Sequence, residues 1–248
     1  MAIIIIPMAG ASSRFYNAGY TVPKYMLPLG NETVFDKSVK SFEMMFWHDK
    51  FVFIVRKDDK GAFDFVNDHA RALGIRNFTV VEIDKITKGQ AETVMEGLYA
   101  LNQDELNEPI YIFNIDTIRK DLFVYYNDYD ALFDAFEDKD ADESKWSFCS
   151  VEKRGWRIKD TAEKEKISNY CSTGLYIFKS ALFYMWLYLR AVKMDKNYNY
   201  YIAPLYNFIQ DKTKTWMLSC DKEDVEFSGV PEEYELLKIK YENEEKID

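Results

Sequence analysis

Residues 3–15 read IIIIPMAGASSRF, and together with PKYMLP at residues 23–28 they decide the fold of this chain. Four consecutive isoleucines predict a strand that is buried on both faces, as in a parallel sheet. Small residues follow at once, so the backbone N–H groups of the next loop can approach an anion closely. Arg14 and Lys24 add positive charge, and two prolines fix the segment that carries the lysine. The stretch therefore predicts a phosphate-binding loop, although the Gly-Lys-Ser/Thr of a Walker loop is absent.

The composition indicates a globular protein with a substantial core. Of the 248 residues, 48% are hydrophobic, and the formal net charge is −10. An acidic balance argues against a general binder of nucleic acid or of anionic membranes, so we expect neither partner. Cys149, Cys171 and Cys220 are scattered without a C-x-x-C pair, which predicts neither disulfides nor zinc and favours the reducing cytoplasm. The first apolar run is too short for a signal peptide, and no later run approaches the length of a membrane span.

Strand and helix patterns alternate along the chain, which is typical of a doubly wound α/β sheet. The expected strands are residues 3–7, 51–55, 78–83, 110–113, 148–151, 174–178 and 216–219. The expected helices are residues 34–47, 64–74, 90–101, 181–193 and 231–240, and residues 242–248 are expected to fray. Neither repeats nor linkers interrupt the pattern, so we expect one domain over residues 1–248. Open α/β sheets bind ligands beyond the carboxyl ends of their strands, where the unusual residues of this chain lie.

Two further segments carry groups suited to nucleotide chemistry. Gly89 and Gln90 open the helix expected from residue 90, where glycine lets a base ring approach and the amide can pair with a base edge. Asp116 ends the strand at residues 110–113, and Mg²⁺ bound to a triphosphate takes one or two such carboxylates. Each pattern also has a plain structural explanation, namely a helix capped by Thr87 and an exposed turn aspartate.

These residues together resemble the signature of the nucleotidylyltransferases, which join a nucleoside triphosphate to a phosphorylated acceptor and release pyrophosphate. The familiar members act on sugar 1-phosphates or phosphocholine, and the short members from capsule biosynthesis are the most similar. The resemblance implies a Rossmann-like, mixed sheet of the GT-A-like type, with residues 1–120 mainly binding nucleotide and residues 145–235 mainly binding the acceptor. It also implies Mg²⁺, a nucleoside triphosphate with CTP favoured, and a small phosphorylated acceptor with L-glutamine phosphate favoured.

The same resemblance assigns roles to residues. Lys24 and Arg14 would be catalytic. Nucleotide would be bound by Met8, Ala9, Gly10, Ala11, Ser12, Ser13, Arg14, Lys24, Gly89, Gln90, Ala91 and Asp116. Acceptor would be bound by Glu163, Lys164, Thr173, Gly174 and Tyr201. Without the resemblance, residues 163–168 (EKEKIS) are typical of a solvated charged loop.

The match fails at the second metal ligand. The family carries an aspartate before a glycine-containing turn near its C-terminus, and here residues 224–231 read DVEFSGVP, with Phe227 in that place. We expect Asp116 and Glu226 to bind the metal, with Asp224 as the other candidate. Two other functions stay open: a strand-end aspartate also fits a metal-dependent glycosyltransferase, and the displaced second carboxylate fits a non-catalytic nucleotide-binding protein. The aromatic-rich second half could also hold a homodimer interface.

Overall fold

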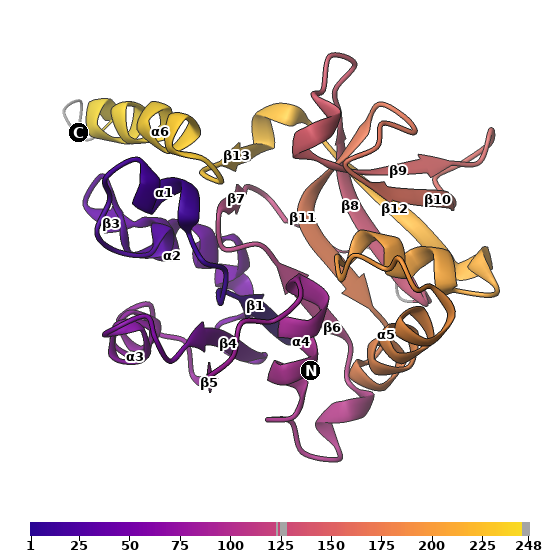
Figure 1. Ribbon diagram of the computed structural model, residues 1–248, viewed down its shortest axis with the longest axis horizontal. Coiled ribbons are helices and arrows are strands. Elements are labelled where there is room, and N and C mark those ends of the chain that lie inside the picture. The colour runs from indigo at the N-terminus through magenta and orange to yellow at the C-terminus, as the bar shows by residue number, and fades with distance from the viewer. Residues whose placement is uncertain (123, 125–127, 245–248) are drawn as a thin grey trace.

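The computed structural model describes residues 1–122, 124 and 128–244 (Figure 1). Its centre is a nine-stranded mixed sheet. The main path of the sheet is β10 (Ile158–Glu163), β9 (Ser147–Val151), β11 (Tyr170–Phe178), β6 (Ile110–Phe113), β1 (Ile3–Pro7), β4 (Lys50–Arg56) and β5 (Asn77–Ile83). β8 (Ala131–Glu137) branches from β11 and pairs in parallel with β12 (Thr215–Cys220).

The four strands β6, β1, β4 and β5 run parallel, whereas β11 enters antiparallel to β6. Ile3 to Ile6 are fully buried, and successive isoleucines join different core clusters on the two faces of the sheet. Apolar faces on both sides require helices on both sides, which is the doubly wound arrangement that the isoleucine run predicts.

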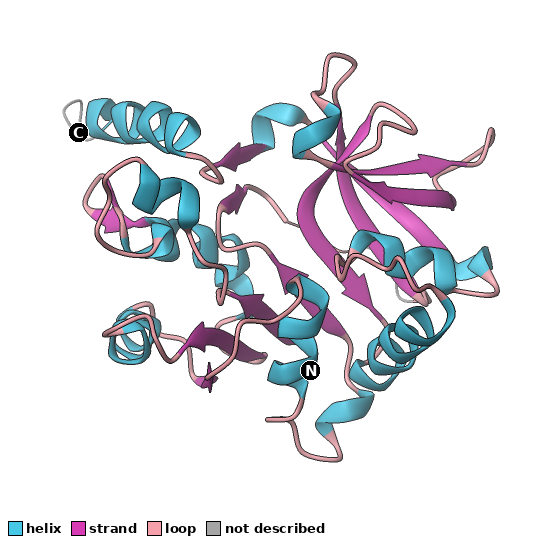
Figure 2. Ribbon diagram, viewed as in Figure 1, coloured by secondary structure: helices cyan, strands magenta, loops and turns pink. Residues whose placement is uncertain are grey.

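Helices cover both faces of the sheet (Figure 2). The α-helices are α1 (Ser13–Asn17), α2 (Val34–Val39), α3 (Ala62–Ala72), α4 (Gln90–Leu98), α5 (Ala181–Met194) and α6 (Pro231–Glu244). Short 3₁₀ turns occupy Lys24–Met26, Lys40–Met45, Glu105–Asn107, Glu143–Lys145, Ala203–Phe208, Lys212–Lys214 and Lys222–Asp224. No helix among the described residues combines the length and the apolar character needed to cross a bilayer.

Two short sheets hold the site loops. β2 (Pro28–Leu29) pairs with β3 (Glu32–Thr33), just after the lysine segment. β7 (Thr117–Arg119) pairs with β13 (Val225–Phe227) and brings the C-terminal part of the chain beside Asp116. α6 then lies beside α1, where Tyr234 packs edge-on against Phe15 (Figure 1).

Several expected elements differ from the structure. The helix expected at residues 34–47 ends at Val39, because Phe42 leaves helical geometry (φ −113°, ψ 23°) and the chain continues as a 3₁₀ turn. β8 and β10 were not expected, since β8 carries an aspartate in its middle and β10 is a polar edge strand. Residues 242–244 belong to α6 rather than to a frayed end, and residues 245–248 lie outside the described part of the chain.

A buried ion pair joins three of these strands. Asp134 on β8 is 1% exposed, and its Oδ2 accepts hydrogen bonds from Arg119 Nε (3.1 Å) and from Thr173 Oγ1 (2.7 Å). Burial raises the pKa of Asp134, although Arg119 and Thr173 both favour its ionised form. The pair therefore connects β7, which follows Asp116, through β8 to β11, which contains Thr173 and Gly174.

We expect Asp134→Ala to lower the free energy of unfolding by about 3–5 kcal/mol, because it leaves the Arg119 charge buried without its partner. Urea unfolding followed by circular dichroism measures the loss. Asp128→Ala is the matched control, since Asp128 forms an exposed ion pair with Lys214 at 2.6 Å; we expect it to change stability by less than about 1 kcal/mol. Equal effects of the two substitutions would contradict the role of the buried pair.

Candidate active site

Two adjoining pockets lie at the carboxyl ends of the central parallel strands. The loop pocket, of about 320 Å³, is formed by the loop after β1 and the segment before α4. The strand pocket, of about 440 Å³, is formed mainly by β11, the end of β10 and the turn after β13. Both pockets are lined by Lys24, Gln90, Asn114 and Asp116, so these four residues mark their junction.

The loop pocket gathers most of the residues expected to bind nucleotide. It is lined by Met8, Ala9, Gly10, Ala11, Ser12, Lys24, Gly89, Gln90 and Asp116. Ser12 adopts a left-handed conformation (φ 48°) that turns the chain into α1, and its Oγ accepts the Lys24 N–H at 3.4 Å. Three expected residues lie elsewhere: Ser13 and Ala91 line neither pocket, and Arg14 lines the strand pocket.

Gly89 has a different neighbour from the one expected. A Cβ at this position would lie 2.7 Å from the Tyr200 carbonyl oxygen, which accepts the Ala91 N–H at 2.8 Å. The room left by the missing side chain is thus taken by the backbone of Tyr200 rather than kept free for a base ring. Thr87 does not cap α4 either, because the N-cap residue is Gly89 and has no side-chain cap.

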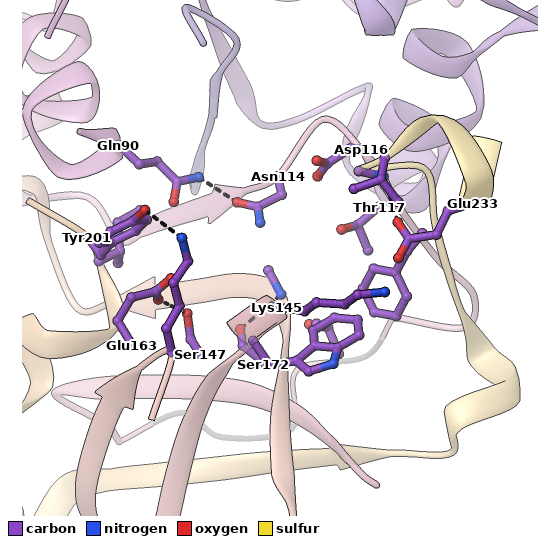
Figure 3. Close-up of a pocket in the computed structure, with 18 of the residues that line it drawn as sticks. Gln90, Asn114, Asp116, Thr117, Lys145, Ser147, Glu163, Ser172, Tyr201 and Glu233 are labelled. Atoms are coloured by element: carbon purple, nitrogen blue, oxygen red, sulfur yellow. Dashed lines mark hydrogen bonds between the residues drawn. The ribbon is translucent and has the colours of Figure 1, made fainter. Parts of the chain in front are cut away.

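At the junction, the ammonium of Lys24 forms an ion pair with Asp116. Both side chains remain about one-fifth exposed, so a ligand entering from either pocket can reach them. Gln90 donates a hydrogen bond to Asn114 Oδ1 (Figure 3), and both residues line both pockets. Asn114 was not expected as a site residue; its place at the end of β6, two positions before Asp116, was the available signal.

The strand pocket brings together all five residues expected to bind the acceptor, Glu163, Lys164, Thr173, Gly174 and Tyr201. Their side chains do not all face it equally, because Thr173 is fully buried and its hydroxyl is bonded to Asp134. Lys164 has a left-handed backbone (φ 56°), and its Nζ donates to Tyr201 OH at 3.3 Å (Figure 3).

Glu163 provides a half-buried carboxylate in the strand pocket. It accepts a hydrogen bond from Ser147 Oγ, which in turn accepts one from Tyr176 OH at 3.2 Å. Burial raises the pKa of Glu163, while Ser147 and the Lys164 charge act in the opposite direction. Trp146 and Phe227 add an aromatic wall, with ring centroids 4.7 Å apart. The pocket therefore offers charges of both signs beside aromatic rings.

The structure does not place Glu226 at the expected metal site. Side chains alternate along β13, so Phe227 faces the strand pocket while Glu226 lies against α6 and lines neither pocket. There it bonds to Lys240 and to Tyr241 OH (2.6 Å). Burial opposes ionisation, but these hydrogen bonds outweigh it and hold the pKa of Glu226 below its usual value.

Glu233, rather than Glu226, places a second carboxylate near Asp116. Its Oε2 accepts the Gly229 N–H at 3.0 Å, and a Cβ at Gly229 would lie 3.5 Å from that oxygen and 3.2 Å from Asp116 Oδ2. Asp116 and Glu233 thus border the same small space. Within the described residues no cluster of three or more carboxylate, histidine or cysteine side chains could hold a metal, so a cation here would complete its shell with phosphate oxygens or water.

The mixed sheet with ligand pockets at the ends of its parallel strands is the Rossmann-like fold of the nucleotidyltransferases. Residues 3–215 match the family model described as nucleotidyl transferase, and the chain belongs to this family. No curated protein matches the sequence.

Solved structures support the same assignment. The nucleoside-diphosphate-sugar pyrophosphorylase from Vibrio cholerae RC9 is 40% identical over 95% of this chain and 99% of that chain, with a TM-score of 0.87. Two others share the fold at lower identity. A putative glucose-1-phosphate thymidylyltransferase from Bacillus anthracis is 19% identical over 98% of this chain and 96% of that chain (TM-score 0.76). The inositol-1-phosphate CTP transferase from T. maritima is 18% identical over 97% of this chain and 95% of that chain (TM-score 0.68).

Gly174→Ala tests whether the Gln90–Asn114 hydrogen bond at the junction of the two pockets is needed for activity. Gly174 has φ +92°, and an added Cβ would lie 2.7–2.9 Å from side-chain atoms of Asn114. We expect the substitution to displace Asn114 from Gln90 and to lower turnover at least tenfold, with a stability loss of roughly 1–3 kcal/mol from strain and crowding. Gly155→Ala is the control, because Gly155 also has positive φ (96°) but meets nothing within 4 Å. Similar turnover in the two variants would argue against the role of Asn114.

Proposed function

We propose that this nucleotidyltransferase transfers a nucleoside monophosphate from a triphosphate to a small phosphorylated acceptor and releases pyrophosphate. The observation that carries the proposal is the junction of the loop and strand pockets at Lys24 and Asp116. A triphosphate in the loop pocket and a phosphate in the strand pocket would meet there. CTP is the favoured donor and L-glutamine phosphate the favoured acceptor, in the modification of a capsule or surface polysaccharide.

The reaction needs charge stabilisation more than proton transfer. An acceptor phosphate oxygen attacks the α-phosphorus, a new P–O bond forms, and the bond from the α-phosphorus to the bridging oxygen breaks as pyrophosphate leaves. An ionised phosphate is already a nucleophile, so no general base is required. Lys24 would neutralise charge between the two reactants, and the N–H groups of the loop after β1 would hold the departing pyrophosphate. Arg14 and Lys164, which line the strand pocket, would bind the acceptor phosphate.

A divalent cation suits the acidic side of the junction. Asp116 and Glu233 offer the hard oxygen ligands that Mg²⁺ prefers, and they border one space. When bound, Mg²⁺ would offset negative charge on the triphosphate. Lys24 forms an ion pair with Asp116 in the structure, and its ammonium would exchange this carboxylate for a phosphate when substrate binds.

The strand pocket supports an acceptor that carries both signs of charge. Glu163 offers a carboxylate for an ammonium group, and Lys145 and Lys164 offer cations for a phosphate or a carboxylate. An amino-acid phosphate such as L-glutamine phosphate has all three groups. A sugar 1-phosphate is the second candidate, because the relative with 40% identity is a nucleoside-diphosphate-sugar pyrophosphorylase; phosphocholine is the third. Cytoplasmic location and a homodimer stay predictions.

Pyrophosphate release tests the proposal directly. CTP, UTP, dTTP, ATP and GTP are each incubated with Mg²⁺ and with L-glutamine phosphate, phosphocholine or a sugar 1-phosphate. We expect release with CTP and L-glutamine phosphate, together with a product that contains both. Release with another pair would replace the substrates, and nucleotide binding without release from any pair would overturn the reaction.

Lys24→Ala should lower turnover about 10²–10³-fold while leaving the melting temperature nearly unchanged, because its ammonium stabilises charge at the junction. Lys153→Ala removes an exposed lysine outside both pockets and serves as the control. Turnover of Lys24→Ala within twofold of the control would contradict the assigned role.

Glu233→Gln and Glu226→Gln separate the two candidate metal ligands. Calorimetric titration of the favoured triphosphate with and without Mg²⁺ measures how much the cation strengthens binding. We expect Glu233→Gln to lose at least tenfold of that Mg²⁺ effect, since a ligand oxygen is replaced by an amide. Glu226→Gln should retain the effect but unfold at lower temperature, because Lys240 loses its ion pair. The reverse pattern would restore Glu226 as the ligand.

A further inference from the structure

The loop pocket contains polar groups that the proposed reaction does not use. Tyr25, Arg56 and Asp59 come from the 3₁₀ turn after the phosphate loop and from the end of β4. Within the described part of the chain, the buried atoms Tyr25 OH, Arg56 Nε and Asp59 Oδ2 have no hydrogen-bond partner. Tyr25 is 1% exposed, and both Tyr25 and Arg56 line the loop pocket. Buried polar atoms without partners cost folding free energy, so the unpaired donors of Tyr25 and Arg56 in this pocket point to a ligand that pairs with them.

These groups lie on the far side of β1 from the reacting phosphates. Lys24 pairs with Asp116, which follows β6, whereas Arg56 ends β4, and β6 and β4 flank β1 on opposite sides. Two strand spacings separate these strands by about 10 Å. Arg56 is in register with Ile83 at the end of β5, next to the segment that leads to Gly89. A nucleotide whose α-phosphate lies at Lys24 would therefore extend its base toward Arg56.

The charges around Arg56 favour a neutral ligand over a phosphate. Its Nη2 lies 3.8 Å from Asp58 Oδ2 and 3.8 Å from Asp59 Oδ1, so the guanidinium has carboxylates nearby but no close hydrogen bond to either. Burial raises the pKa of Tyr25, which keeps its hydroxyl protonated as a donor. A polyphosphate would be repelled by the two aspartates, whereas a base edge presents uncharged acceptors.

From this geometry we propose that Arg56, assisted by the Tyr25 hydroxyl, reads the edge of the nucleobase by donating to two adjacent acceptors. The inference rests on the proposed function, because it concerns the base of the same triphosphate. Cytosine presents N3 and O2 side by side as acceptors, which suits a guanidinium. Uracil and thymine place an N–H between their two oxygens, and adenine lacks a pair of adjacent acceptors; guanine presents O6 and N7 side by side, so these donors separate cytosine from uracil and thymine and not from guanine. The residues therefore select cytosine against the other pyrimidines.

The test compares Arg56→Ala, Arg56→Lys and Tyr25→Phe with Lys57→Ala, an exposed neighbour that lines neither pocket. Binding of CTP, UTP, CMP and cytidine is titrated for each protein. We expect wild type to prefer CTP to UTP, and Arg56→Ala to weaken CTP, CMP and cytidine by a common factor of roughly 5- to 150-fold, the range for one good bidentate contact. UTP binding should change little, Arg56→Lys should recover only part of the loss, and Lys57→Ala should match wild type.

Equal weakening of CTP and UTP by Arg56→Ala, with cytidine unaffected, would assign Arg56 to a phosphate and overturn the inference. A wild-type preference for UTP, or an unchanged CTP-to-UTP ratio in Arg56→Ala, would overturn it as well. Because these titrations need no turnover, they give a result even if no acceptor supports pyrophosphate release. A failed reaction and a failed base assignment are thus distinguished.

Discussion

The whole arrangement depends on burying β1 on both faces. Ile3 to Ile6 are completely removed from solvent, which is possible when α2 and α3 cover one face and α4 and α5 cover the other. With every side of β1 occupied by strands or helices, its carboxyl end is the place where the chain can leave the core. The loop after β1, the 3₁₀ turn that begins at Lys24 and the loop after β6 all lie at this end of the strand. The position of the site therefore follows from the burial of β1 on both faces.

Most of the strands of the central sheet could be predicted from local sequence, and the strands that were missed share a physical cause. β1, β4 and β6 are runs of β-branched and aromatic residues, which have few alternatives to a buried strand. β8 carries Asp134, whose burial depends on Arg119 and Thr173 from distant parts of the chain. Such tertiary compensation is invisible in a local pattern.

The site residues also divide into those that local sequence predicts and those that depend on tertiary contacts. The loop after β1 and Asp116 were predicted to lie together, and both line the loop pocket, because strand-end loops are set by short-range sequence. Glu226 was chosen because it is next to Phe227, which occupies the place of the family's aspartate, but a one-residue difference along a strand reverses the face of a side chain. Glu233 reaches the site because it lies one helical turn beyond Gly229, where its carboxylate accepts the Gly229 N–H. Asn114 and Arg56 likewise line pockets that form only when the fold brings distant segments beside them, so a local pattern does not identify them as site residues.

The pairing of β7 with β13 also has a consequence for biosynthesis. Asp116 accepts a hydrogen bond from Ser228, which is 112 positions later in the chain. A nascent chain that has emerged as far as Asp116 already contains the segments of β1, β4, β5 and β6 and all the residues that line the loop pocket. It still lacks Gly229 and Glu233, so the acidic side of the junction is completed only after the last helix leaves the ribosome. The residues of the loop pocket and those of the acidic side of the junction are thus synthesised at different moments.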